Sequence, residues 1–142
     1  LSRQKVLTLS QVSAETRRVG VRKGAYVLRK EEGALECIIM ATGSEVEAAL
    51  EAADQIGAGA RVVSAPCLER FDRQSAEYRE EVLPAACRKR VAIEAGVSGL
   101  WHKYTGLDGA VVGIDRFGIS APGDVVLDTL GMNAETIVKA LG

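Results

Sequence analysis

The feature that most constrains this sequence is the alternation of short apolar runs with segments that carry apolar residues at helical spacing. In the run at residues 36–42 the apolar centre is continuous rather than alternating, which is the pattern of a strand covered on both faces. Strands that alternate with helices are joined by right-handed crossovers into a mainly parallel sheet. We therefore expect an α/β fold, a three-layer helix/sheet/helix sandwich.

The apolar runs predict about five strands. The charged turn between the first two strands is short, which favours a hairpin, so we expect the first strand to run antiparallel to the second. The other strands are expected to be parallel. The predicted strands are residues 25–28, 36–42, 61–65, 90–94 and 110–114.

Helices are expected after four of these strands. The first begins at residues 43–44, where Ser44 and Glu47 have the spacing of a capping box. Its apolar residues recur at i, i+3, i+4 and i+7, so they share one face. The residues on that face are Val46, Ala49, Leu50 and Ala53, and the other helices are expected over residues 73–83, 98–104, 122–130 and after Asn133.

Residues 1–20 show no clean periodicity, and we interpret them as an interdomain linker or arm before a single domain at residues 21–142. A chain of 142 residues buries roughly two-thirds of the surface that its unfolded form exposes, so it needs no disulfide or metal for a core. The first residue is Leu1 rather than methionine, and we expect the chain to be a piece of a longer protein.

Charge, apolar run length and cysteine content limit the kinds of partner and the compartment that we expect for this protein. The formal net charge of −1 gives no field that would steer the chain onto nucleic acid or an anionic membrane. The apolar runs are far shorter than the roughly 20 residues of a membrane span. The odd cysteine count (Cys37, Cys67 and Cys87) indicates free thiols in a reducing compartment, so we expect a cytoplasmic protein.

Candidate sites are sought where the parallel strands end, because ligands of open α/β sheets bind there. The turn Thr42-Gly43-Ser44 opens a helix, and backbone N–H groups at such a turn favour an anion. Ser44 acting as a plain N-cap explains the same residues and is the stronger interpretation. The other strand ends are residues 64–66, 94–96 and 115–118.

Two features that resemble functional motifs are interpreted as structural. Gly57-Ala58-Gly59 begins like a dinucleotide fingerprint, but it ends a helix instead of opening one, so we expect a helix stop. His102 is the only histidine and has no nucleophile or carboxylate at a useful spacing, which indicates a helix-end or surface residue.

The remaining candidates carry no clear chemistry. Glu94 is either a carboxylate perturbed by burial or an acceptor of hydrogen bonds from a neighbouring loop or chain. Asp115 and Arg116 are expected to form a loop ion pair, and Trp101 and Tyr104 to pack or to line an interface. The residues alone therefore indicate an α/β domain without a self-sufficient active site and without a metal site.

Several segments, in order, resemble one family. They are residues 1–4 (LSRQ), 24–28 (GAYVL), 41–46 (ATGSEV), 60–64 (ARVVS), 71–74 (FDRQ), 78–84 (YREEVLP), 94–96 (EAG) and 115–122 (DRFGISAP). Together they resemble the C-terminal domain of transketolase, and the likeness covers essentially the whole chain. That resemblance implies the same mostly parallel sheet with one antiparallel strand.

The resemblance also implies a parent enzyme of three domains, a homodimer. Its first two domains bind thiamine diphosphate and a divalent cation (Mg or Ca), and it transfers a two-carbon ketol unit from a ketose phosphate to an aldose phosphate in the pentose phosphate pathway. The catalytic residues of the family belong to the domains that are absent here, so the 142-residue chain alone is expected to be inactive.

One substrate contact is carried over by the resemblance. In transketolases the arginine of the Ser-Arg-Gln segment reaches the terminal phosphate of the substrate, and the matching residue is Arg3. A guanidinium suits this role because it is always charged and binds phosphate oxygens in bidentate fashion. The implied partners are the remaining transketolase domains, a second subunit and sugar phosphates.

Two alternatives stay open from the sequence. One is a regulatory anion-binding module with its site at residues 42–44. The other is the last domain of a different thiamine diphosphate enzyme, such as 1-deoxyxylulose-5-phosphate synthase.

Overall fold

The structure is a computed structural model that describes residue 6, residues 8–119 and residues 122–142. Five strands form one sheet in the order β1-β3-β2-β4-β5. The strands are β1 Tyr26–Arg29, β2 Cys37–Ala41, β3 Ala60–Ser64, β4 Arg90–Ile93 and β5 Ala110–Val112. The helices are α1 Ala14–Lys23, α2 Val46–Ile56, α3 Leu68–Asp72, α4 Ala76–Val82, α5 His102–Thr105, α6 Gly123–Thr129 and α7 Ala134–Leu141, with 3₁₀ turns η1 Gly43–Glu45 and η2 Ser98–Leu100.

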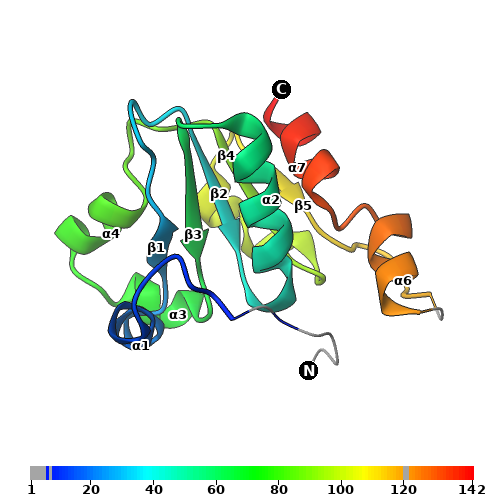
Figure 1. Ribbon diagram of the computed structural model, residues 1–142, viewed down its shortest axis with the longest axis horizontal. Coiled ribbons are helices and arrows are strands. Elements are labelled where there is room, and N and C mark those ends of the chain that lie inside the picture. The colour runs from blue at the N-terminus through cyan, green and yellow to red at the C-terminus, as the bar shows by residue number, and fades with distance from the viewer. Residues whose placement is uncertain (1–5, 7, 120–121) are drawn as a thin grey trace.

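The sheet is covered on both faces, as the sequence predicts (Figure 1). Helices α2 and α7 pack on one face, and α3, α4 and α5 pack on the other. Side chains of β2 alternate between the two layers, since Ile39 belongs to one core cluster and Ile38 and Met40 to the other. The three-layer α/β sandwich is confirmed.

Small residues let α2 lie close to the sheet. Ala49, Ala52 and Ala53 are completely buried, and every residue of β2 and β3 is buried. The continuous apolar runs in the sequence therefore correspond to strands enclosed on both sides. The helix ends at Gly57, whose φ of +101° suits glycine, which confirms the expected helix stop.

The expected hairpin is wrong, although the first strand is antiparallel. Strand β1 pairs with β3, where Tyr26 faces Ser64, and not with the strand that follows it in the sequence. Both edges of β2 are occupied by parallel partners, β3 and β4. The short link between β1 and β2 therefore spans the width of β3 instead of forming a tight turn.

Two helical predictions also differ from the structure. The helix expected over residues 73–83 is shorter in the structure, where α4 covers Ala76–Val82 and the hydroxyl of Ser75 caps it by accepting from the N–H of Tyr78 at 3.3 Å. Helix α3 precedes that range and has no counterpart in the sequence-based prediction. Helix α1 occupies part of the segment interpreted as a linker. Only Gly20 is buried in it, so it has no apolar face to produce a periodic signal. The predicted boundary between the linker and the domain, at residue 20, falls inside α1, and that boundary stays a prediction.

The expected capping box does not form. Residues Gly43–Glu45 make the 3₁₀ turn η1, and α2 begins only at Val46. The hydroxyl of Ser44 donates to Oε1 of Glu45 at 2.6 Å, so Ser44 does not cap α2 with its side chain. A 3₁₀ turn at the start of the helix shifts the capping position, and the local sequence does not signal that shift.

Candidate functional site

The carboxyl ends of the parallel strands form one edge of the sheet, and α1 and α3 lie along it (Figure 1). A hollow of about 300 Å³ opens here between α1, the η1 turn and the end of β3. Its walls combine apolar residues with the polar side chains of Arg17, Ser44, Glu47 and Ser64. The turn singled out in the sequence thus borders a real depression.

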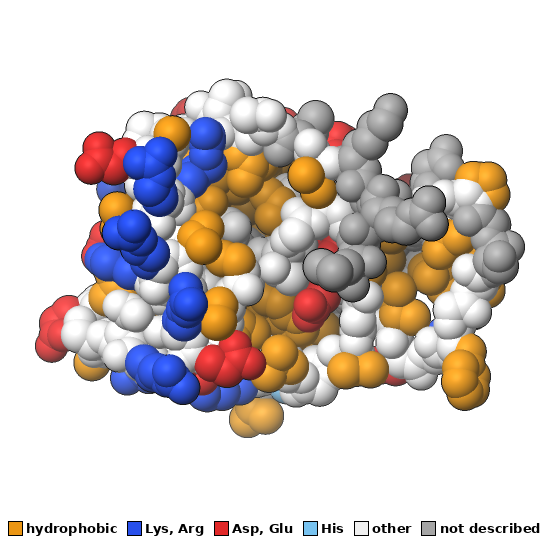
Figure 2. All heavy atoms as spheres, turned by 90° about the horizontal axis from the view of Figure 1, so that it is seen from below, with side chains coloured by type: hydrophobic (Ala, Val, Ile, Leu, Met, Phe, Trp, Pro, Cys, Tyr) orange, Lys and Arg blue, Asp and Glu red, His pale blue; other side chains and the backbone are white. Residues whose placement is uncertain are grey.

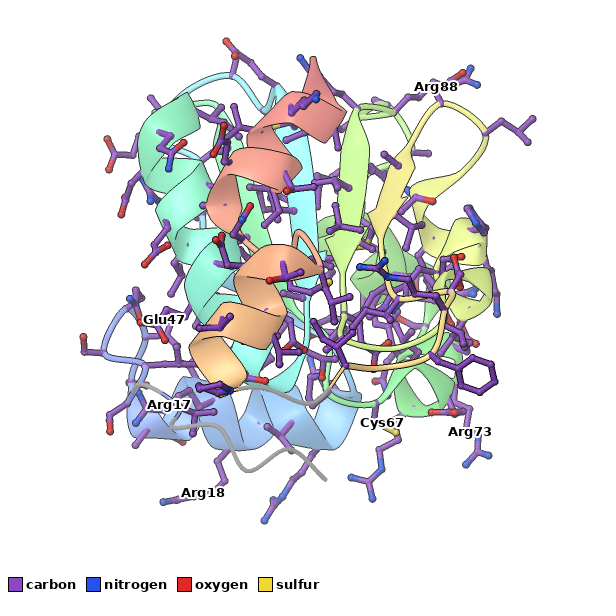
Figure 3. All side chains as sticks on the ribbon, turned by 90° about the vertical axis from the view of Figure 1, so that its right-hand side faces the viewer. Arg17, Arg18, Glu47, Cys67, Arg73 and Arg88 are labelled. Atoms are coloured by element: carbon purple, nitrogen blue, oxygen red, sulfur yellow. The ribbon has the colours of Figure 1, made fainter. Side chains whose placement is uncertain are left out.

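Arg17 is a residue of this hollow that sequence reasoning missed, because it lies in the segment interpreted as a linker. Its guanidinium donates to the carbonyl oxygen of Val12 at 3.1 Å, which holds the side chain against the chain that leads into α1. Figure 3 shows Arg17 and Glu47 on the same side of the molecule, and both line the hollow. No periodicity or motif in the sequence could have placed Arg17 there.

The charges around the Thr42–Ser44 turn are mixed. The carboxylate of Glu45 is buried and takes the hydrogen bond of Ser44, and Glu47 adds a second carboxylate. Two carboxylates beside a short turn oppose an anion, whereas Arg17 favours one. The anion site at Thr42, Gly43 and Ser44 therefore stays a prediction. Arg3, the predicted phosphate contact, lies outside the described residues.

A second polar cluster joins α3 to α5. The ammonium of Lys103 and the hydroxyl of Tyr104 both donate to Oδ2 of Asp72, at 2.7 and 3.0 Å. Partial burial opposes ionisation of Asp72, but these hydrogen bonds and the charge of Lys103 outweigh it and hold the pKa of Asp72 below its usual value. Burial and the adjacent carboxylate raise the pKa of Tyr104. The cluster therefore holds two helices together with every named group satisfied.

The carboxylates after β4 and β5 also serve as structural acceptors. The indole N–H of Trp101 donates to Oε2 of Glu94 at 2.6 Å, which confirms the hydrogen-bonding interpretation of Glu94. Asp115 accepts from the backbone N–H of Ser98 at 2.9 Å, and this hydrogen bond lowers the pKa of Asp115. Asp115 and Arg116, both described, form no ion pair with each other, so that expectation is wrong.

Aromatic and histidine residues match the structural interpretation. Trp101 and Tyr104 are buried, and their rings contact edge to face with centroids 6.3 Å apart. His102 is exposed at the start of α5.

The three cysteines are free thiols. Cys37 and Cys87 are buried and Cys67 is half-buried. Burial raises the pKa of the Cys37 and Cys87 thiols, which disfavours the reactive thiolate. These two residues therefore belong to the core.

Among the described residues there is no group of three or more His, Cys, Asp or Glu side chains that could hold a metal ion. No helix in the described part of the chain is long and apolar enough to span a membrane.

Comparison with known proteins decides the family. The family model described as the transketolase-like C-terminal domain matches residues 24–133. This chain belongs to the transketolase family, as its C-terminal domain. The transketolase of Physarum polycephalum is 59% identical over 140 residues, which cover 99% of this chain and 21% of that protein. The Staphylococcus epidermidis transketolase is 47% identical over 142 residues, covering 98% of this chain and 21% of that protein.

Solved structures agree with the family assignment. A transketolase from Leishmania mexicana matches with a TM-score of 0.84 and 41% identity, over 96% of this chain and 19% of that one. A Pichia stipitis transketolase in complex with sedoheptulose 7-phosphate matches with a TM-score of 0.82 and 32% identity, over 98% of this chain and 20% of that one. The chain thus spans about a fifth of the transketolases it matches, and these comparisons support transketolase rather than the alternative parents.

Proposed function

We propose that this chain is the C-terminal domain of an active transketolase, a transferase that moves a two-carbon ketol unit from a ketose phosphate to an aldose phosphate. The observation that carries the proposal is 59% identity to a transketolase along nearly the whole chain. We further place the parent in the cytoplasm, as a homodimer that works in the pentose phosphate pathway.

The cofactor is assigned to the rest of the parent. Thiamine diphosphate is held through a divalent cation, which prefers several oxygen ligands on one site. The described residues bring no such group of carboxylates together, and the hollow at η1 is lined by one carboxylate, Glu47, and one guanidinium, Arg17. These residues do not fit the cofactor, so no step of the reaction is assigned to them.

The proposed contribution to substrate binding is Arg3. The guanidinium would bind the terminal phosphate of the sugar and so orient the donor, with the reacting carbon in another domain. The support is the match of residues 1–4 to the family segment, together with the chemistry of a phosphate contact.

The first test is Arg3→Ala in the full-length parent. A charged hydrogen bond to phosphate contributes roughly 1.5–3 kcal/mol, so kcat/KM for xylulose 5-phosphate is expected to fall about 10- to 150-fold. The value for hydroxypyruvate, which has no phosphate, is expected to stay unchanged. Arg18→Ala is the matched control, since Arg18 is an exposed arginine on α1. Equal loss with both donors, or loss with neither, contradicts the role of Arg3.

A second test separates the parent from the fragment. The unsubstituted parent is expected to transfer ketol units, whereas the purified 142-residue chain is expected to have no activity with added thiamine diphosphate and Mg²⁺. Measurable ketol transfer by the chain alone would contradict the assignment of catalysis to the other domains. An inactive parent would overturn the proposed function itself.

A further inference from the structure

Four large apolar side chains are exposed around the carboxyl ends of β4 and β5. They are Val97, Leu100, Phe117 and Ile119, with exposed fractions of 69%, 52%, 99% and 44%. We call these four residues the apolar patch. Figure 2, which views the carboxyl edge directly, shows apolar side chains over much of this face, while basic side chains gather along one side of it.

The loops that carry the apolar patch are tied together. The backbone N–H of Ser98 donates to Asp115 at 2.9 Å, and the N–H of Ile114 donates to the carbonyl oxygen of Gly96 at 2.7 Å. A Cβ at Gly113 would lie 3.1 Å from that same carbonyl oxygen, so the close approach of the two loops favours glycine there. Val97 and Phe117 each lie within two residues of a position that forms one of these hydrogen bonds. The hydrogen bonds therefore restrain the loops from which these two side chains project.

An exposed phenylalanine ring has an unfavourable contact with water that a partner surface would remove. Exposed apolar residues scattered singly are ordinary, but several on joined loops mark an interaction site. The opposite edge of the sheet supplies the contrast. Leu107, which precedes β5, is fully exposed there without other large exposed apolar residues among its described sequence neighbours.

The rest of the parent is the occupant that the molecule favours. The chain covers 21% of the Physarum polycephalum transketolase, and the family model that it matches describes a C-terminal domain, so we expect the other domains of the parent to precede it. Helix α1, the first helix of the described residues, lies along the same edge of the sheet as the carboxyl ends of the parallel strands (Figure 1), so the chain that leads into this domain arrives at this edge. Contacts between domains of one chain bury roughly 600–1,500 Å² in total, and four large side chains suit the apolar centre of such an interface.

We infer that Val97, Leu100, Phe117 and Ile119 form the surface on which the preceding domains of the parent transketolase dock. The inference rests on the proposed function, because it needs a parent with such domains. It assigns a task to the loops after β4 and β5 that neither catalysis nor the core explains: they hold this domain against the rest of the enzyme.

The test is photo-crosslinking in the full-length parent. Benzoylphenylalanine is introduced in place of Phe117 in one variant and in place of Leu107 in the other, and the crosslinked peptides are mapped by mass spectrometry. Position 117 is expected to crosslink to sequences that precede this domain, and position 107 is not. Crosslinks from 117 only to a second copy of residues 1–142, or no crosslinks from 117, would overturn the inference.

A charge substitution provides an independent readout. Phe117→Asp in the parent is expected to lower the thermal midpoint and to increase amide hydrogen exchange at the surface of the preceding domains. Leu107→Asp is the matched control and is expected to change neither. An unchanged exchange pattern in Phe117→Asp also overturns the inference. Neither readout depends on ketol transfer, so failure of the docking surface is distinguishable from failure of the proposed function.

Discussion

Arg61 and Arg90 lie at the amino ends of β3 and β4. The guanidinium of each residue forms several hydrogen bonds with other groups of the domain. Arg61 binds Glu31 in bidentate fashion at 2.6 and 2.7 Å and also donates to the carbonyl oxygen of Glu81 at 2.8 Å. Both members of the pair are more than nine-tenths buried. Arg90 donates to four backbone carbonyl oxygens around the end of α4 and α5.

The arginines of the carboxyl edge are in the opposite situation. Arg18 and Arg22 on α1 and Arg70 and Arg73 in and after α3 are exposed, and none has an ion-pair partner among the described residues. Figure 3 shows Arg18 and Arg73 at one end of the molecule and Arg88 at the other. Arginine thus makes buried contacts at the amino ends of β3 and β4, whereas these four arginines of the carboxyl edge are exposed without an ion-pair partner among the described residues. Composition alone does not distinguish the two roles.

The largest difference between the edges is expected from Arg61→Ala. Removing one partner of a buried ion pair leaves Glu31 charged and unpaired, which costs roughly 3–5 kcal/mol in the free energy of unfolding. Urea unfolding of the chain measures this loss. Arg61→Lys keeps the charge without the bidentate contact and is expected to fall between Arg61→Ala and the unsubstituted chain. A loss from Arg61→Ala as small as that of a surface substitution would remove the distinction between the edges.

A smaller effect is expected from acid. The hydrogen bond from Arg61 lowers the pKa of Glu31 from 4.5. The folded state therefore binds this proton less readily than the unfolded state, so the pair stabilises the fold above the unfolded value and loses its contribution as pH falls through the folded one. The free energy of unfolding, measured between about pH 5 and pH 3, is expected to fall more steeply in the unsubstituted chain than in Glu31→Gln. Parallel curves would show that Glu31 does not titrate with folding.

The smallest effect is expected at the carboxyl edge. Arg18→Ala and Arg22→Ala each remove an exposed guanidinium without an ion-pair partner among the described residues, so the free energy of unfolding is expected to change by less than about 0.5 kcal/mol. The same urea titration measures both variants. A loss near that of Arg61→Ala would mean that α1 is stabilised by contacts of these side chains and that the two edges do not differ.

The three layers of the fold could be predicted from the sequence, but the pairing of the first strand could not. Continuous apolar runs such as residues 37–41 identify buried strands, because a strand that is covered on both faces needs apolar side chains at every position. Which strand lies beside β1 depends on how the edges of β2 are filled, and no residue of β1 records that. Helix α1 gave no signal because its contacts with the domain bury only Gly20.

The candidate site followed the same division. The carboxyl edge could be predicted from topology, and the turn at Thr42–Ser44 does border a hollow there. Arg17 could not be placed, because its position depends on the path of α1 over the sheet. Arg61 carried one overlooked signal: a charge inside an otherwise apolar strand must find a buried partner.

The pairing of β1 with β3 also sets an order of events during synthesis. As the chain leaves the ribosome, β1 has no strand to join until β2, α2 and β3 have all been made. The parallel pair β2 and β3 with α2 can form first, and β1 is then added at the open edge beside it. Strand β1, although it is made before β2 and β3, is therefore the last strand of this half of the sheet to be anchored.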